Sequence, residues 1–328
     1  MTCKKQCRRF TISCATTLRN SASSRPGNRC CWPTPKPPCR STFRTGCISS
    51  EGTEVTITAE QIDACHQAIQ QADGLLITAG AGLGVDSGLP DFRGDGGFWK
   101  HYPALGRRGI DFSSIASPAA FKDNARLAWG FYGHRLNLYR RTLPHDGFTI
   151  LKRIGESLPQ GTFVFTSNVD GQFQKAGFSG ERVAEVHGSI HHLQCVTGCR
   201  DDIWPADDFE PVVDDENCLL TSPFPVCPHC GALARPNILM FGDWQWCGHR
   251  SAAQNAALGS WLGKVERLLV IELGAGTSIP TVRRLGESIN GTLIRINPRE
   301  ADAHRACDIS IRCGALTALK QIEQAWQF

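Results

Sequence analysis

The chain has 328 residues, of which 41% are hydrophobic, and it carries a formal net charge of +4 at pH 7. This length is more than one small core needs, so it predicts two units or one domain with an insertion. No apolar run approaches the roughly 20 residues that span a bilayer, which argues against a membrane protein.

The net positive charge of the chain comes entirely from the first fifty residues. Residues 1–50 hold ten Lys and Arg residues and no Asp or Glu, whereas residues 51–328 hold 25 basic and 31 acidic residues. The net charge therefore gives no sign of a nucleic-acid groove on the folded part, and no direct nucleic-acid partner is predicted. The tail also holds five prolines and seven of the sixteen cysteines, without helical or strand periodicity, so we expect it to be disordered.

Three interpretations of this tail remain open. An acid-free start that is rich in Arg and Ser is typical of an organelle transit peptide, although Trp32-Pro-Thr-Pro-Lys-Pro-Pro-Cys39 would break an amphipathic helix. A start codon assigned too far upstream would look the same, and metal or partner binding is the third interpretation. Among the nine cysteines outside the tail, two close pairs favour metal over disulfides, and hence a reducing, cytoplasmic compartment.

The remaining chain alternates strand-like and helix-like segments. Thr58-Ala-Glu-Gln61 is a capping box for a helix that ends near residue 72. Short apolar strands are expected at residues 75–79, 163–166, 268–273 and 293–296, and a helical portion at about 95–145. The alternation predicts the α/β class, with a doubly wound, parallel, Rossmann-like sheet formed by residues 51–189 and 236–328. In such a sheet the ligand lies at the carboxyl ends of the strands.

A glycine-rich loop follows the first expected strand. Glycines at this place let the backbone approach a pyrophosphate, and the N–H groups that open the next helix point at the anion. A bare G-x-G is weak evidence, because tight turns need glycine for ordinary reasons. The whole string from Leu75 to Gly94, however, resembles the NAD-binding signature of the sirtuins, which are NAD-dependent protein-lysine deacylases. The resemblance implies that the cofactor is bound by Gly80, Ala81, Gly82, Asp91, Phe92 and Arg93.

Two further segments match this family, each with a departure. Gly84 stands where the signature has its first serine, which removes one hydroxyl from the cofactor side. Ser167-Asn-Val-Asp170 follows a strand and resembles the family's Q-N-I-D, with Ser167 in place of Gln. By that resemblance Ser167, Asn168 and Asp170 line the pocket for the ribose and the nicotinamide amide, and Asn168 also serves catalysis. A strand-end turn held by Asn and Asp is the alternative.

One of three neighbouring histidines occupies the family's catalytic-base position. His187 is followed by glycine and precedes a cysteine-rich module, as in sirtuins. A pKa near neutrality would let its imidazole take a proton from a ribose hydroxyl at physiological pH. We expect His191 and His192 to be structural.

Residues 190–235 contain two cysteine pairs, prolines and acidic residues, which indicates a small inserted zinc-binding module. Cys195 and Cys199 form one pair, and Cys227 and Cys230 form the other. Four thiolates suit tetrahedral Zn²⁺, and tight turns bring both sulfurs of a pair onto one ion. Because no ligand position stays open, one structural Zn²⁺ is predicted, with His229 as an alternative ligand.

The resemblance extends to the substrate cleft and the adenosine end. It implies that Phe241 and Gly242 form part of a cleft in which the peptide adds as a strand, although a buried strand is the alternative. It also assigns a group of residues to the adenosine side of the cofactor: Gly274, Gly276, Thr277, Ser278, Asn297 and Cys313.

Tyr132 and Arg135 share one face of an expected helix, because they lie three residues apart. Their spacing resembles the Tyr-x-x-Arg of sirtuins that remove succinyl, malonyl or glutaryl groups. Arginine can pair bidentately with the distal carboxylate of such a chain. A surface ion pair or a packing role is the alternative.

The resemblance covers roughly residues 58–325. It implies an enzyme that transfers an acyl group from a protein lysine to ADP-ribose and releases nicotinamide, with acyl-lysine proteins or peptides as partners. The acyl group is then acetyl or, because of Tyr132 and Arg135, an acidic chain such as succinyl or malonyl. Protein mono-ADP-ribosylation on the same scaffold and a non-catalytic NAD-binding module are the alternatives. Oligomeric state does not follow from the sequence.

Overall fold

The computed structural model describes residues 57–91, 94–303 and 305–325, without the side chains of residues 94–96. The predictions for residues 1–50 and for Phe92 and Arg93 lie outside these residues. The predicted capping box is confirmed at the start of α1 (Ala59–Gln71), where the Thr58 hydroxyl accepts from the Gln61 backbone at 3.2 Å. The Gln61 side chain accepts in return from the Thr58 backbone at 3.0 Å. None of the helices in the described part of the chain combines the length and apolar character needed to cross a bilayer.

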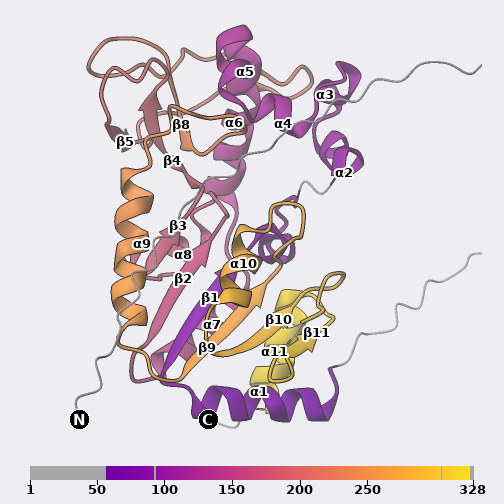
Figure 1. The fold of residues 1–328 in the computed structure, drawn as a ribbon. Coiled ribbons are helices and arrows are strands. Elements are labelled where there is room, and N and C mark those ends of the chain that lie inside the picture. The colour runs from indigo at the N-terminus through magenta and orange to yellow at the C-terminus, as the bar shows by residue number, and fades with distance from the viewer. Residues whose placement is uncertain (1–56, 92–93, 304, 326–328) are drawn as a thin grey trace, which may run out of the picture. The chain divides into compact units, whose positions relative to one another are not determined.

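A six-stranded parallel sheet forms the centre of the fold (Figure 1), in the order β11-β10-β9-β1-β2-β3. Its strands are β1 (Gly74–Ala79), β2 (Thr162–Thr166), β3 (Val183–Glu185), β9 (Leu268–Leu273), β10 (Thr292–Ile296) and β11 (Ile309–Ile311). The chain runs outward from β1 to β3 and then returns to the other side of β1. The strand order therefore reverses between β1 and β9, and ligands of doubly wound sheets bind at such a point.

The strand register brings the ends of the central strands to one level. Ala79 pairs with Thr166 on one side and with Leu273 on the other, and Leu273 pairs with Ile296. The segments that leave these strands consequently start side by side along one edge.

Helices cover both faces of this sheet. α1, α7 (Asp146–Glu156) and α11 (Ala315–Ala325) share one apolar core with it, and α9 (His249–Leu262) shares another. α10 (Thr281–Ser288) belongs to the second core through Val282. Two apolar faces explain why β1 is buried along its whole length, as expected for a central parallel strand.

In the part of the chain that the structure describes, five helices, of which α6 is the longest, and several antiparallel strands form a second lobe with a core of its own. Phe98, Trp129 and Phe131 from the helices pack in one cluster with Leu193 and Ala234 of the cysteine-rich segment. The helices are α2 (Gly94–His101), α3 (Pro103–Arg107), α4 (Phe112–Ile115), α5 (Pro118–Asp123) and α6 (Ala125–Arg141). The strands are β4 (Gly188–Cys195), β5 (Ile203–Pro205), β6 (Val213–Asp214), β7 (Leu219–Leu220) and β8 (Ala234–Ile238). The helical portion thus packs with the cysteine module as one lobe.

The predicted class and the four predicted strands are confirmed, with bounds shifted by one residue at most. The glycine-rich loop differs in detail, because it continues as a 3-10 helix, η1 (Ala81–Ser87). Two further short elements, α8 (Gln172–Lys175) and η2 (Gly180–Arg182), connect β2 to β3.

Candidate active site

Two glycine-rich loops contact each other where the strand order reverses. The Gly80 backbone donates to Leu273 O at 3.0 Å, and the Gly82 backbone donates to Gly274 O at 3.1 Å. A Cβ on Gly82 would lie 2.7 Å from the Gly274 Cα, and a Cβ on Gly274, whose φ is +59°, would lie 2.3 Å from the Leu83 backbone nitrogen. Glycine is therefore required for the packing of the two loops, whether or not their backbones also approach a ligand.

The position that lacks the serine of the family signature is enclosed. Gly84 is buried, and a Cβ there would lie 3.1 Å from a methyl carbon of Leu89. Further along the loop, Asp91 accepts from Arg299 at 3.0 Å. The segment after β1 is thus tied to the segment after β10, and the two flank the same edge.

Asn168 and Asp170 lie at the end of β2, beside the first glycine loop. The Asn168 side chain donates to Gly80 O at 3.1 Å, and its backbone donates to Thr166 Oγ1 at 3.0 Å. Asp170 accepts from the Gln172 backbone at 3.0 Å, and burial raises the pKa of its carboxyl to about 6. Ser167 is half-buried on the same segment. These contacts place Asn168 and Asp170 beside the first glycine loop, and their role in binding a cofactor stays a prediction.

His187 lies in the turn between β3 and β4. The Leu239 backbone donates to its carbonyl at 2.9 Å, while Ile190 of β4 donates to Val169 O at 3.0 Å, which draws this turn to the Asn168 segment. Its ring forms no hydrogen bond with any described residue. The predicted pKa near neutrality is wrong, because burial lowers the pKa of His187 to about 4. The imidazole is therefore neutral at physiological pH and able to accept a proton.

The other two histidines lie on β4. His191 contacts Asp170 O at 3.0 Å through Nε2, which supports the loop that carries Asp170. His192 is half-buried on β4, where burial lowers its pKa to about 4. Neither belongs to the cysteine cluster.

Most of the predicted adenosine-side residues directly follow β9 and β10: Gly274, Gly276, Thr277 and Ser278 come after β9, and Asn297 comes after β10. Asn297 is buried, and its amide donates to Ala275 O at 2.9 Å while its oxygen accepts from the backbones of Arg299 and Glu300. Its side chain consequently holds the two loops together. Thr277 donates to Glu300, Ser278 is exposed, Gly276 is half-buried and Cys313 is buried. A pocket of about 370 Å³ opens beside Thr277 and Glu300.

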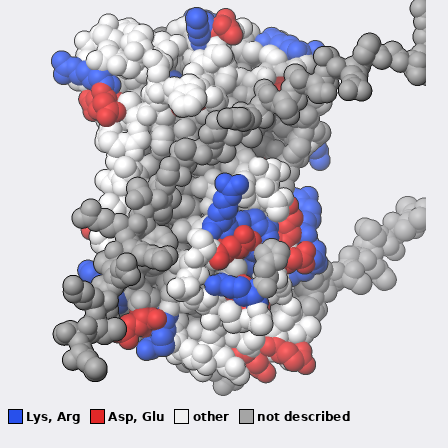
Figure 2. Space-filling model, in the orientation of Figure 1, with Lys and Arg blue, Asp and Glu red and all other residues white. Residues whose placement is uncertain are grey.

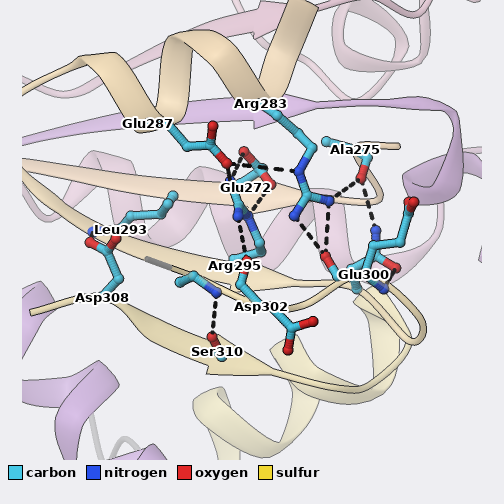
Figure 3. A network of polar contacts seen from close by, with 12 residues as sticks. Glu272, Ala275, Arg283, Glu287, Leu293, Arg295, Glu300, Asp302, Asp308 and Ser310 are labelled. Atoms are coloured by element: carbon cyan, nitrogen blue, oxygen red, sulfur yellow. Dashed lines mark hydrogen bonds and ion pairs between the residues drawn. The ribbon is translucent and has the colours of Figure 1, made fainter. Parts of the chain in front are cut away.

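Sequence reasoning missed a charged network beneath these loops (Figure 3). Arg283 of α10 donates to Glu300 O at 2.9 Å and to Ala275 O at 3.3 Å, so it joins the same two loops as Asn297. Arg295 is fully buried on β10 and pairs with Glu272 of β9 at 2.6 Å. Charged residues inside otherwise apolar strands are the signal that could have revealed this network, because buried charges need partners.

The surface over this region carries both signs of charge. On the face shown in Figure 2, basic and acidic side chains intermingle over α10, β10 and β11. Arg312, for example, pairs with Asp302 at 2.8 Å.

The four predicted cysteines form one cluster in the second lobe. The sulfurs of Cys195, Cys199, Cys227 and Cys230 all lie within 4.8 Å of one another. The Cys195–Cys230 and Cys199–Cys227 distances are 3.7 and 3.6 Å. A tetrahedral zinc site with bonds of about 2.3 Å places its sulfurs about 3.8 Å apart. The donor set thus fits one structural Zn²⁺, as predicted, and His229 instead contacts Asp202 at 2.8 Å.

Tyr132 and Arg135 are both buried on α6. Arg135 donates to the Tyr139 hydroxyl at 2.7 Å and lies over the rings of Phe131, Tyr132 and Tyr139. Gln172, which follows Asp170, donates to Tyr139 O and Thr142 O at 3.4 Å, so the end of this helix lies beside the segment after β2.

The segment after β8 carries the predicted cleft residues Phe241 and Gly242. The Phe241 backbone donates to Ala116 O at 2.9 Å, and its ring lies 5.8 Å from that of Phe112. Phe241 is 38% exposed, so the alternative of a wholly buried strand does not apply to it. Gly242 is exposed and has a φ of +66°.

The sequence of this chain matches one known family. A family model described as the Sir2 family matches residues 80–271, which is more than half of the chain. The chain belongs to the Sir2 family. The relationship predicted from the motifs is thus confirmed, whereas the Tyr-x-x-Arg subclass stays a prediction.

Two relatives of this Sir2 protein are named NAD-dependent protein deacylase. The protein from Aquifex aeolicus is 26% identical over 254 residues, which cover 76% of this chain and 93% of the relative. The protein from Thermococcus sibiricus is 27% identical over 258 residues, which cover 76% and 91%.

Solved structures share the fold of this Sir2 protein. A Sir2 homolog–NAD complex superimposes with a TM-score of 0.59 at 22% identity, over 80% of this chain and 93% of the other. Sir2Tm bound to a propionylated peptide gives a TM-score of 0.58 at 19% identity, over 80% and 98%.

Proposed function

We propose that this Sir2 protein is an NAD-dependent protein-lysine deacylase. The observation that carries the proposal is the convergence of His187, Asn168 and Asp170 on the edge where two glycine loops meet. The relatives named NAD-dependent protein deacylase support it, since they match most of the chain. NAD supplies the ADP-ribose that receives the acyl group.

Each residue at this edge of the sheet has a different proposed role, which follows from the chemistry of its side chain. The neutral His187 imidazole takes a proton from a ribose hydroxyl, and its ring has no competing hydrogen bond among the described residues. Asn168 and Asp170 orient the ribose and the nicotinamide amide. Asn297 and Arg283 hold the loops of the adenosine end.

Product analysis tests this activity. We expect mass spectrometry of the protein with NAD and an acetyl-lysine peptide to show nicotinamide, the deacylated peptide and O-acetyl-ADP-ribose. Transfer of ADP-ribose to protein in the absence of an acyl peptide would instead favour mono-ADP-ribosylation. NAD binding without nicotinamide release from any acyl peptide would indicate a non-catalytic module.

Asp170 predicts the pH dependence of this reaction. Its carboxyl has a pKa of about 6, so it is ionised and able to accept the nicotinamide amide above that pH. We expect kcat/KM to fall as the pH drops through about 6, because kcat/KM reports groups of the free enzyme. His187 stays neutral over this range, since its pKa is about 4.

The variant Asp170→Asn is expected to remove this acid limb while lowering the rate at pH 7.5. The matched control is Asp63→Asn on the exposed side of α1, which should keep the wild-type profile. A limb near pH 6 that survives in Asp170→Asn would contradict the assignment.

We further propose that Tyr132 and Arg135 adapt the acyl pocket to a chain with a distal carboxylate. The proposal is supported by the contact of their helix with the segment after Asp170 and by the buried guanidinium, whose pairing with an anion would meet little competition from water. A reducing, cytoplasmic location is also proposed, supported by the free thiols of the nine described cysteines.

Substitution of Arg135 tests the acyl preference. In Arg135→Met we expect the ratio of succinyl to acetyl turnover to fall about 10- to 100-fold, since a hydrogen bond to a charged group contributes about 1.5–3 kcal/mol. The ratio is the readout because loss of a buried side chain lowers both rates. Arg141→Met, an exposed site on the same helix, should leave the ratio unchanged. An unchanged ratio in Arg135→Met would make the arginine a packing residue.

A further inference from the structure

Trp244 is the most exposed large apolar side chain of the described residues, at 96% exposure. It lies in the segment between β8 and α9 (Figure 1), two residues after Gly242. A tryptophan left in water forgoes the burial that stabilises other aromatic side chains, and such residues are enriched at contact sites.

An ion pair and hydrogen bonds anchor the residues on both sides of Trp244. The Asp243 side chain is fully buried and pairs at 2.8 Å with Arg235, which is also buried. The Asp243 carboxylate accepts from the Gln245 backbone at 3.1 Å, and Gln245 O accepts from Gln194 at 2.8 Å. Both neighbours of Trp244 are therefore anchored, so its exposure is fixed by the fold and costs little entropy on binding.

This segment lies next to the candidate base. Leu239 donates to the His187 carbonyl, and the chain reaches Trp244 five residues later. Among the described residues, none hydrogen-bonds to the backbone of Gly242 or Trp244. An extended peptide whose acyl-lysine approaches His187 could pair with this free backbone, and its neighbouring side chains would then meet the indole.

An exposed acidic side chain lies beside the start of α9, the helix that follows this segment. Asp201 is 76% exposed and lies 3.5 Å from His249. The charge of Asp243 is already balanced by Arg235. A cationic side chain suits this surrounding, and a tryptophan face is the best aromatic partner for a cation.

Resting on the proposed deacylase function, we propose that Trp244 selects protein substrates with a lysine or arginine close to the acyl-lysine, through a cation–π contact. The contact is made in both the bound and the reacting complex, so it lowers KM and leaves kcat unchanged. Exposed cation–π contacts correspond to about a 2- to 5-fold change in kcat/KM.

A set of acetyl-lysine peptides tests this proposal. In each peptide, one of the two positions before or the two positions after the acetyl-lysine carries Arg, Leu or Glu. In Trp244→Ala we expect a 2- to 5-fold rise in KM for the Arg peptide at its preferred position, with kcat and the Leu and Glu peptides unchanged. Trp244→Phe should keep part of the preference. Val212→Ala is the control, because it also removes an exposed apolar side chain in the same lobe. It should leave KM and kcat unchanged for all peptides.

A wild-type protein without preference for Arg, or a Trp244→Ala variant that changes all peptides alike, would overturn the proposal and leave deacylation intact. Fluorescence anisotropy of labelled acetyl peptides with and without the flanking Arg measures the same preference without turnover. If no acyl peptide releases nicotinamide, the proposed function fails, and the anisotropy ratio between wild type and Trp244→Ala still decides the role of the indole.

Discussion

Replacement of His187 by alanine is expected to lower kcat about 10²- to 10⁴-fold, the usual contribution of a general base. NAD affinity should change little, because the ring forms no hydrogen bond that holds the glycine loops or the Asn168 segment. Nicotinamide release from an acetyl peptide measures the rate, and NAD titration by calorimetry measures binding.

His66→Ala is the control for this variant. His66 lies on α1, where its ring contacts Ile322 O at 2.9 Å, and it should retain the wild-type rate. A His187→Ala protein with near wild-type turnover would refute the base assignment. Loss of NAD binding together with turnover would instead show that His187 supports the pocket.

Loss of one cysteine ligand is expected to have the largest effect on stability. Cys227→Ser removes a thiolate from a cluster whose sulfurs lie at tetrahedral spacing, and structural Zn²⁺ contributes about 10–16 kcal/mol to the folding of zinc-finger peptides. We expect zinc content to fall from one ion per chain to nearly none. The melting temperature should drop by more than about 10 °C, since 1 kcal/mol corresponds to about 2–4 °C in domains of about 150–250 residues.

Cys307→Ser is the matched control, because Cys307 is exposed and lies outside the cluster. Metal analysis and thermal denaturation should give wild-type values for it. A Cys227→Ser protein that keeps one zinc and its melting temperature would exclude this residue as a ligand.

The sequence predicted the parts of the fold that have a strong local signal. The strands around β1 and β9 are continuous apolar runs, and the capping box of α1 depends on four adjacent residues. The cysteine pairs were predictable for the same reason, since ligand spacing is local. The short outer strands β3 and β11 were missed, because three residues carry too little pattern to distinguish a strand from a loop.

The sequence predicted which residues form the candidate site, but not which contacts their side chains make. Asn297 was expected to meet the cofactor, and only the structure shows that its amide joins two loops. The pKa of His187 also depends on burial by residues distant in sequence, which no motif encodes. Arg283 and the Arg235–Asp243 pair went unnoticed because their partners lie in other segments or in an otherwise ordinary loop.

The packing of Gly80 against Gly274 has a consequence for protein synthesis. A nascent chain that ends before β9 leaves β1 without its neighbour on one side and the first glycine loop without its counterpart. Contacts between such distant segments form late. The ribosome must therefore synthesise the chain through β9 before the two glycine loops can form a dinucleotide site. Truncated translation products would therefore be catalytically silent, even though they contain every residue from the first glycine loop to the candidate base.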